Sequence, residues 1–188
     1  RSLIEVNSES WRQRYLSALP DYGDADNVVD KQPLNFRSIG LIRVLFPDSP
    51  ILFMRRHAVD VGLSIFRHKF AKSWPCAHHL ADIGHYYGIH ERMFRYWVSR
   101  PEVALTVVDY SHLVRNPDTA IHALLASSGL DFEPACLQPH KTRRQVATFS
   151  SVQVQNPVTT RYINRSAPYA QLLQPLRDEL LRAGVEVC

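Results

Sequence analysis

Three residues, Lys31, Arg56 and Tyr110, each end or closely follow a short apolar stretch that the sequence predicts to be a buried strand. Ligands of parallel α/β sheets bind at the carboxyl ends of the strands, so these side chains are candidates for binding or catalysis. Ser64 follows Arg56 by eight residues, in the helix expected after the second strand. A guanidinium and a hydroxyl near a helix N-terminus favour an anion, because free N–H groups and the helix dipole also attract negative charge.

The segments that must position these residues alternate between strand and helix. Apolar stretches bounded by turn residues predict strands at 28–30, 51–54 and 103–108. Apolar residues at helical spacing predict helices at 34–46, 59–70, 78–99 and 118–128. The alternation is typical of an α/β fold, in which helices flank a parallel sheet. Since residues 51–54 are apolar throughout, we expect that strand to be covered on both faces.

The remaining segments lie outside this alternation. Residues 1–22 are typical of a polar helix, and residues 169–182 predict a last helix that stops at Gly184. Residues 132–165 are rich in Pro, Gln, Thr and Ser and contain four Arg, which predicts a long loop or short irregular elements. A stretch of that length in a compact domain is more often functional than idle.

The composition excludes several classes of protein. With 45% hydrophobic and 21% charged residues over 188 positions, the chain is expected to fold, and as one domain rather than two large ones. The apolar run 51–54 is far too short to span a bilayer. The 22 Lys and Arg against 18 Asp and Glu give a net charge of +4. This excess fits an anionic partner, either a small phosphate- or sulfate-bearing molecule or a nucleic acid.

The three cysteines, Cys76, Cys136 and Cys188, are far apart and form no Cys-x-x-Cys pair. They therefore indicate neither a disulfide framework nor a thiolate zinc site. The chain begins at Arg1, and no charged and then apolar leader follows. Both observations favour a cytoplasmic, reducing location.

Four stretches, taken together, resemble the sulfotransferases that use 3′-phosphoadenosine-5′-phosphosulfate (PAPS), in particular the tyrosylprotein sulfotransferases and bacterial relatives with tetratricopeptide repeats. The matching stretches are 30–36 leading to 45–47, then 56–64, 110–114 and 150–158. The last is similar to the family's Ser-x-x-Gln-Val-x-x-Pro segment. The order and spacing are kept, and the resemblance runs from about residue 28 to about residue 181.

The resemblance implies a role for each matching residue. Lys31 would stabilise charge on the transferring sulfonate and the leaving phosphate oxygen, and Ser150 would lie near the sulfonate. Arg56 and Ser64 would hold the 3′-phosphate of the nucleotide. The other residues that it places at the nucleotide are Tyr110, Gln153, Asn156 and Arg165. The reaction implied is metal-free in-line transfer of a sulfuryl group from PAPS to a hydroxyl, which releases adenosine 3′,5′-bisphosphate. The hydroxyl could belong to a protein tyrosine, a carbohydrate or a small molecule.

The sequence also departs from the family pattern. No glycine lies in a run like the family's Pro-Arg-Ser-Gly-Thr-Thr 5′-phosphosulfate loop, and the general-base glutamate that follows this loop is not found. His57 and Ala58 stand where the family usually has an acidic residue and Pro, and Ser111 stands where Glu is common. We therefore expect a sulfotransferase fold of the P-loop-NTPase-like type that is incomplete at the N-terminus. Residues 1–26 would form a lead-in helix and turn, and 27–188 a partial sulfotransferase domain with little or no turnover alone.

Four other interpretations stay open from the sequence. The chain could be a degenerate domain of this fold that binds a nucleotide or a protein without catalysis. A nucleotide kinase would share the sheet topology but needs a Walker-type loop, which the sequence lacks. His78, Asp82 and His85 have the spacing of a helical zinc site, although nine histidines make chance spacings common. Four arginines around Tyr162 could form a nucleic-acid surface; they are Arg143, Arg144, Arg161 and Arg165.

Overall fold

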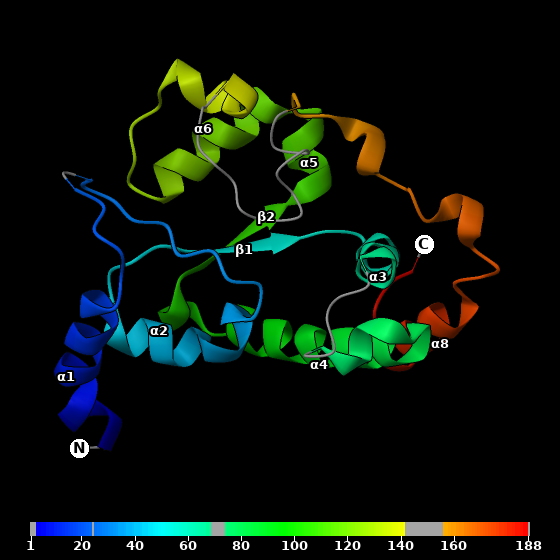
Figure 1. Ribbon diagram of the computed structural model, residues 1–188, viewed down its shortest axis with the longest axis horizontal. Coiled ribbons are helices and arrows are strands. Elements are labelled where there is room, and N and C mark those ends of the chain that lie inside the picture. Colours follow the sequence, from blue (N-terminus) through cyan, green and yellow to red (C-terminus); the bar gives the residue numbers. More distant parts are fainter. Residues whose placement is uncertain (1–2, 24, 69–73, 142–155, 188) are drawn as a thin grey trace. The chain divides into compact units, whose positions relative to one another are not determined.

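A two-stranded parallel sheet lies between helices in the computed structural model, which describes residues 3–23, 25–68, 74–141 and 156–187. The strands are β1 (Ile51–Arg55) and β2 (Leu105–Asp109), which are hydrogen-bonded neighbours (Figure 1). The chain passes from β1 to β2 through α3 (Ala58–Arg67) and α4 (Leu80–Val98). Parallel strands need such a crossover connection. The predicted α/β class, with helices flanking a parallel sheet, is therefore confirmed.

The other described helices precede and follow this crossover. They are α1 (Leu3–Ser17), α2 (Ile39–Leu45), α5 (Tyr110–Arg115), α6 (Pro117–Ser127) and α8 (Gln174–Arg182). Short 3₁₀ turns connect them; these are Asn35–Ser38, Pro75–His78, Pro101–Val103, Pro134–Leu137, Pro139–Lys141, Thr160–Tyr162 and Ala167–Tyr169. Within the described ranges, no helix is long and apolar enough to cross a membrane.

The chain divides into two compact units. The first comprises residues 1–51 and 92–105, and the second comprises residues 52–91 and 106–188. In the first unit α1 packs on α2, and Gly40 of α2 approaches the indole of Trp97 so closely that a Cβ there would lie 2.7 Å from Cη2. The Arg43 guanidinium donates hydrogen bonds to the carbonyls of Pro47, Ser49 and Val103, which ties the turn after α2 to residue 103.

Tyr15 of α1 holds the segment before α2 in the first unit. Its hydroxyl donates a 2.8 Å hydrogen bond to Asp30, and its ring meets Phe46 edge-on at 5.3 Å. Burial and the hydrogen bond to the Asp30 carboxylate raise the pKa of Tyr15 to about 12. The phenol therefore stays protonated as a donor at neutral pH, which fixes Asp30, the neighbour of Lys31.

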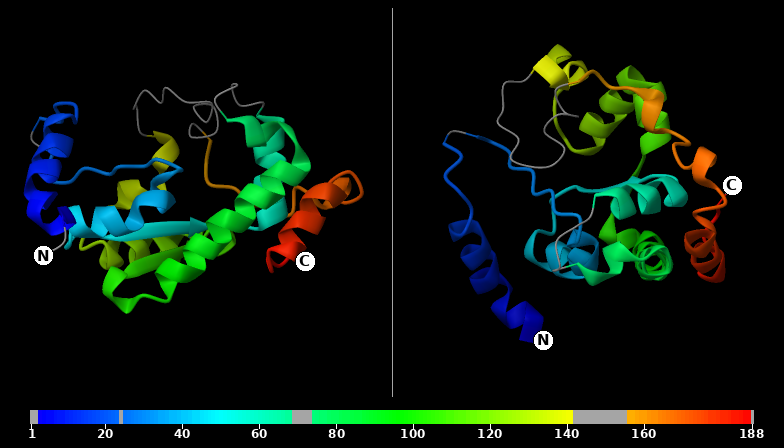
Figure 2. Two further views of the ribbon diagram at one scale, coloured as in Figure 1. Left: turned by 90° about the horizontal axis from the view of Figure 1, so that it is seen from below. Right: turned by 45° about the vertical axis from the view of Figure 1, so that its right-hand side comes forward.

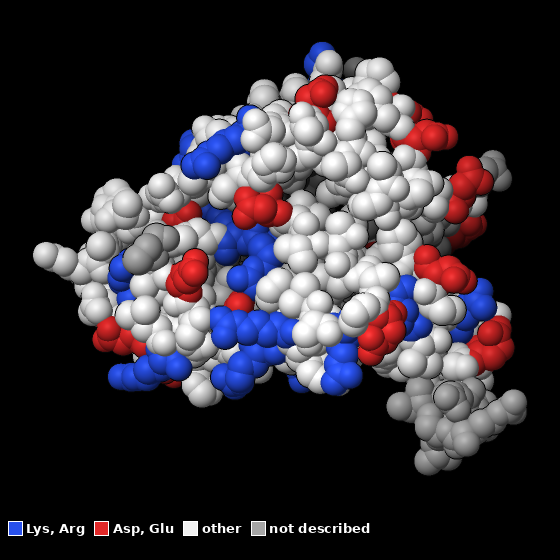
Figure 3. Space-filling view, turned by 180° about the vertical axis from the view of Figure 1, so that it is seen from behind, with Lys and Arg blue, Asp and Glu red and all other residues white. Residues whose placement is uncertain are grey.

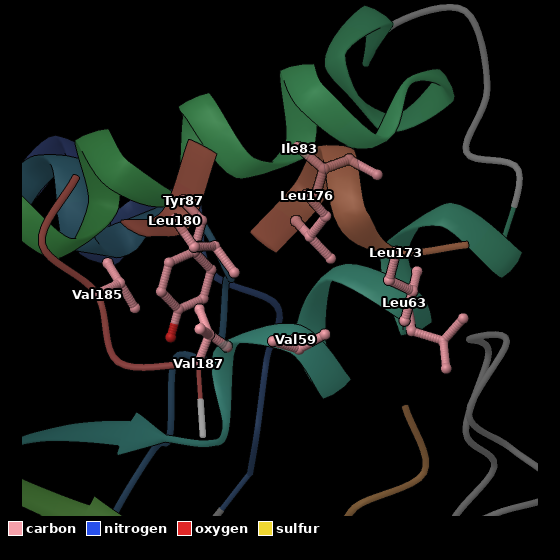
Figure 4. Close-up of a cluster of buried hydrophobic side chains, with 10 residues drawn as sticks. Val59, Leu63, Ile83, Tyr87, Leu173, Leu176, Leu180, Val185 and Val187 are labelled. Carbon is pink, nitrogen blue, oxygen red and sulfur yellow. The ribbon is translucent and has the colours of Figure 1, made fainter. Parts of the chain in front are cut away.

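The second unit has its core between α3, α4 and α8 (Figure 4). Leu176 and Leu180 of α8 are fully buried, at 0% exposure, and each stabilises the fold by about 1.5–3 kcal/mol through burial. The helices approach closely because glycines face α8. A Cβ on Gly62 would lie 2.4 Å from Leu176 Cδ2, and one on Gly84 would lie 2.6 Å from Glu179 Cβ. Figure 2 shows α8, in red, beside this part of the unit.

Two predictions about strands are wrong. Residues 28–30 form no strand: they are exposed, with Val29 at 84% exposure, and only β1 and β2 pair in the part of the chain that the structure describes. An apolar pair becomes a strand only where a neighbouring strand supplies its hydrogen bonds. β1 is not covered on both faces, because Leu52 and Met54 are exposed while Phe53 is buried.

Two helix boundaries also differ from the prediction, and one helix was not predicted. The expected helix 78–99 is split, because His78 closes the 3₁₀ turn Pro75–His78 and α4 begins only at Leu80. The last helix begins at Gln174 rather than at residue 169. α5, which the sequence pattern did not indicate, starts at Tyr110 because the Asp109 carboxylate caps it, accepting a 2.6 Å hydrogen bond from the His112 amide.

Candidate functional site

Arg56 is the centre of the candidate site, at the junction of β1 and α3 in the second unit. Its Nη2 donates a 2.6 Å hydrogen bond to the carbonyl of Tyr162, and its guanidinium carbon lies 4.9 Å from the centre of the Tyr110 ring. The Tyr87 hydroxyl donates to the Arg56 carbonyl at 3.4 Å, and in Figure 4 this hydroxyl points out of the core toward the β1–α3 connection. Arg56 therefore joins the strand end to α4, α5 and the 3₁₀ turn Thr160–Tyr162.

Asp60 lies one turn further along, in the first turn of α3, and is buried at 2% exposure. Its Oδ1 accepts a 2.8 Å hydrogen bond from the backbone amide of Ser166, which is also buried. Its Oδ2 lies 3.9 Å from Arg56 Nη2. One carboxylate thus faces both the arginine at the strand end and the segment that follows the 3₁₀ turn.

The Tyr162 ring lies against two further cations. The guanidinium carbons of Arg161 and Arg165 lie 4.7 Å and 5.5 Å from the centre of its ring. The chain then turns through Asn164, whose φ of +55° is left-handed, a conformation that asparagine tolerates better than most residues. This turn returns the backbone to Asp60, so that Arg56, Tyr162 and Arg165 belong to one cluster.

Several polar atoms of this cluster are buried without a hydrogen-bond partner among the described residues. They are Arg56 Nε, both ring nitrogens of His57, and Asp60 Oδ2. Burying an unpartnered polar group costs free energy, so such atoms are uncommon unless a ligand or solvent satisfies them. The donors of Arg56 and the flanking arginines suit an anion such as a phosphate, which a guanidinium can bind through two N–H groups.

The neighbouring arginine, Arg55, has a different environment. Its Nη1 donates a 2.6 Å hydrogen bond to Glu91 of α4, whose side chain is 5% exposed. His90 packs between Phe53 and Tyr87, with ring centres 5.3 Å and 5.2 Å away. Burial, with a smaller contribution from the positive charge of Arg55, lowers the pKa of His90, and burial raises that of Tyr87. Both shifts favour the neutral form of the group. The residues on this side of β1 therefore contribute to packing in the core.

Residues 2–134 match the Sulfotransferase family, a match that covers most of the chain. The chain belongs to the sulfotransferase family. It is also similar to an uncharacterized protein of Aquifex aeolicus (strain VF5), with 30% identity over 160 residues, which are 84% of this chain and 21% of that protein. The sulfotransferase chain therefore spans about a fifth of the length of this relative.

The structure brings three of the predicted site residues together, and the others lie elsewhere or outside the described residues. Arg56, Tyr110 and Arg165 lie in the cluster around Tyr162. Ser64 is half-buried on α3, one turn after Asp60, and Asn156 is exposed where the described part of the C-terminal segment begins. Lys31 is exposed and belongs to the first unit. Ser150 and Gln153 lie outside the described residues.

The alternative sites have less support than the cluster around Arg56. His78 lies outside α4, so it does not share a helical face with Asp82 and His85, and no group of three metal-ligating side chains occurs in the described ranges. Figure 3 shows Asp and Glu side chains lying among Lys and Arg. Of the four arginines in the proposed nucleic-acid surface, Arg161 and Arg165 lie on the Tyr162 ring. Arg143 and Arg144 lie outside the described residues.

Sequence reasoning missed three contributors to the site. Asp60 carried a usable signal, because it lies in the first turn of the expected helix, four residues after Arg56, where its carboxylate can pair with the arginine at the strand end. Tyr162 stood out only as an aromatic residue between arginines. The amide of Ser166 had no signal at all, since every residue except proline carries one.

Proposed function

We propose that this sulfotransferase uses PAPS as the sulfuryl donor and transfers the group to an acceptor hydroxyl, with adenosine 3′,5′-bisphosphate and a proton as the other products. The observation that carries the proposal is the position of Arg56, at the carboxyl end of a strand, with a buried Nε that lacks a partner and two more arginines around Tyr162. Ligands of parallel α/β sheets bind at this end of the strands.

The residues that we assign to nucleotide binding belong to the second unit. Arg56 and Ser64 would hold the 3′-phosphate, the first by charge and two N–H groups and the second by its hydroxyl. The Tyr110 ring beneath the guanidinium keeps it in place and favours its charge at a distance of 4.9 Å. Arg165 would add a second cation at the nucleotide, and Asn156 and Gln153 would belong to the loop over it.

We assign Lys31 and Ser150 to the sulfuryl group that is transferred. When bound, PAPS supplies an activated sulfuryl group whose transfer spreads negative charge over the leaving phosphate and the sulfonate. A lysine ammonium stabilises such charge more in the transition state than in the ground state, which is the requirement for catalysis. The serine would donate a hydrogen bond to the sulfonate. Tyr15 supports this end by holding Asp30, next to Lys31, with its 2.8 Å hydrogen bond.

The proposal also includes the type of sulfotransferase to which the chain belongs. The resemblance of residues 150–158 to the Ser-x-x-Gln-Val-x-x-Pro segment supports a protein of the tyrosylprotein sulfotransferase type, or of the bacterial type with tetratricopeptide repeats. The acceptor is then a hydroxyl of a protein tyrosine, a carbohydrate or a small molecule.

The deciding experiment compares adenosine 3′,5′-bisphosphate with 5′-AMP by calorimetry at low salt, for the wild type and for Arg56→Ala. We expect the wild type to prefer the bisphosphate by tenfold or more, about 1.4 kcal/mol, and the variant to lose the preference. Arg177→Ala, at a half-buried arginine on α8, is the control and should keep it. Equal affinities for the two nucleotides in the wild type would reject the proposed 3′-phosphate site.

A second measurement separates an enzyme from a binding domain of the same fold. Lys31→Ala should leave the affinity for adenosine 3′,5′-bisphosphate within threefold of the wild type, because Lys31 is assigned to the sulfuryl group. Sulfuryl transfer from PAPS to a phenol is measured in a form extended at the N-terminus with a 5′-phosphosulfate loop, because we expect little turnover from the 188 residues alone, and Lys31→Ala should lower that rate at least 100-fold. Tight binding without any transfer, by the wild type both alone and in the N-terminally extended form, would favour the non-catalytic alternative.

A further inference from the structure

A buried hydrogen bond joins α3 to the C-terminal segment at the candidate anion site. Asp60 Oδ1 accepts it from the Ser166 amide at 2.8 Å, and both residues are at most 5% exposed. Only four residues before Ser166, the Tyr162 carbonyl accepts the 2.6 Å hydrogen bond from Arg56 Nη2. The same short segment is therefore attached at one end to Asp60 and at the other to Arg56.

These contacts close a ring of interactions. Arg56 is bonded to Tyr162, the backbone runs through the left-handed Asn164 to Ser166, Ser166 is bonded to Asp60, and Asp60 Oδ2 lies 3.9 Å from Arg56 Nη2. The direct contact between Asp60 and Arg56 is too long for a hydrogen bond. Asp60 and Arg56 are therefore connected by hydrogen bonds through residues 162–166, and not by a hydrogen bond to each other.

We propose that Asp60 is the positioning residue of the anion site, and that it acts through its hydrogen bond to Ser166 rather than through its charge. By fixing Ser166, it holds the Tyr162 carbonyl where Arg56 donates to it and keeps Arg165 on the Tyr162 ring, 5.5 Å from guanidinium carbon to ring centre. Both arginines then meet an anion in one prearranged geometry, which avoids part of the entropic cost of binding. The proposal rests on the proposed 3′-phosphate site.

The role of the acceptor and the role of the charge can be separated by substitution. Asp60→Asn keeps an oxygen that can accept from Ser166 but removes the negative charge near Arg56. Asp60→Ala removes both. Ser166→Pro removes the amide donor, and its φ of −78° is one that proline adopts. It also removes the hydroxyl and restricts Arg165 in the turn from Asn164 to Ala167, so its defect supports the proposal only where Asp60→Ala shows the same one. If the hydrogen bond is what matters, the alanine and proline variants should share a defect that the asparagine variant lacks.

Glu91 offers a matched control. It is a second buried carboxylate, at 4% exposure, and it faces Arg55, the residue next to Arg56. Glu91→Ala and Glu91→Gln remove the same groups from a neighbouring ion pair without touching residues 160–167. A general loss of stability would affect both pairs of variants alike, whereas a positioning role is confined to the Asp60 pair.

The experiment measures amide hydrogen exchange of the full chain and the preference for adenosine 3′,5′-bisphosphate over 5′-AMP. Asp60→Ala and Ser166→Pro should raise exchange across residues 160–167 at least tenfold, leave peptides from α4 and α8 unchanged, and reduce the nucleotide preference below threefold. Asp60→Asn should keep both properties near wild type, as should the two Glu91 variants.

Each result has a distinct meaning. Unchanged exchange across residues 160–167 in both Asp60→Ala and Ser166→Pro would overturn the proposal, whatever the nucleotides do. A loss of nucleotide preference in Asp60→Asn as large as in Asp60→Ala would overturn it too, because the charge would then be the active property. If the wild type shows no preference while exchange rises as expected, the proposed function fails and Asp60 still positions the segment.

Discussion

Arg55 and Arg56, adjacent at the end of β1, have guanidinium groups with entirely different partners. Arg55 donates to the buried carboxylate of Glu91 at 2.6 Å, whereas Arg56 donates to the carbonyl of Tyr162 at 2.6 Å and faces Asp60 only at 3.9 Å. Successive side chains of a strand leave on opposite faces, which separates the two environments. The first arginine is bound to a full counter-charge, and the second keeps a buried Nε without a partner in the described part of the protein. Arg56 is the one of the two suited to an anion.

Tyr110 should contribute to nucleotide affinity through its ring rather than through its hydroxyl. The ring lies under the Arg56 guanidinium at 4.9 Å, a contact worth about 0.5–1 kcal/mol. Tyr110→Ala should therefore weaken binding of adenosine 3′,5′-bisphosphate by about two- to fivefold. Tyr110→Phe should stay within twofold of the wild type in the same titration. An equal loss in both variants would assign the effect to the hydroxyl.

Asn164 should tolerate glycine and reject a β-branched residue. Its φ of +55° is left-handed, which costs most residues about 1–2 kcal/mol and β-branched residues more. Asn164→Gly should leave the urea midpoint and the nucleotide preference near wild type. Asn164→Val should increase exchange across residues 160–167, since this turn carries the backbone from Tyr162 to Ser166. Similar exchange in the two variants would show that the turn has no part in holding the segment.

The elements around the site follow largely from local pattern. Three features are predictable from neighbouring residues: the apolar run of β1, the helical spacing in α3 and α6, and the glycine stop at Gly184, whose φ is +69°. Residues 28–30 have a similar local pattern and no pairing strand, so they stay irregular and exposed. α5 was missed because its six residues are too few to show a helical period, and its cap at Asp109 determines where it begins.

The candidate site was predictable only in part, for the same physical reason. Arg56 was found because strand ends carry ligands, a rule that needs only the local pattern. The contacts that hold it join residues that lie 106 positions apart in both cases, Arg56 with Tyr162 and Asp60 with Ser166. Each involves a backbone atom, which leaves no mark in the residue types. Spacing therefore identifies the charged group, and only the fold shows what positions it.

Gly84 should resist even the smallest side chain. Alanine is normally favoured over glycine inside a helix by about 0.5–1 kcal/mol. Here its Cβ would lie 2.9 Å from the Leu176 carbonyl oxygen and 2.6 Å from Glu179 Cβ, and the backbone atom cannot move aside alone. Gly84→Ala should therefore destabilise the protein by about 1–3 kcal/mol in urea unfolding.

Leu176 provides the complementary test of the same contact between helices. It is fully buried, so Leu176→Ala should cost about 2–5 kcal/mol. Leu172→Ala, at a leucine that is 72% exposed, should stay within about 0.5 kcal/mol of the wild type. If Gly84→Ala were instead as stable as the wild type, α8 would pack less closely on α4 than the structure describes.

His90 should make the stability of the fold decrease as the pH falls below about 6.5. Its ordinary pKa is 6.5, and burial together with the positive charge of Arg55 lowers the pKa in the folded state. The unfolded chain then binds more protons than the folded one below neutral pH, so acid favours unfolding. The stabilisation is complete above pH 6.5 and is lost as the pH falls from there toward the lowered folded value.

The variant His90→Phe keeps an aromatic ring between Phe53 and Tyr87 and removes the titrating group. The urea midpoint of the wild type should fall as the pH is reduced from 7.5 to 5.5, and that of His90→Phe should fall less over the same interval. His79→Asn, at an exposed histidine, should follow the wild-type curve. Parallel curves for the wild type and His90→Phe would contradict the prediction, because another group would then carry the pH dependence.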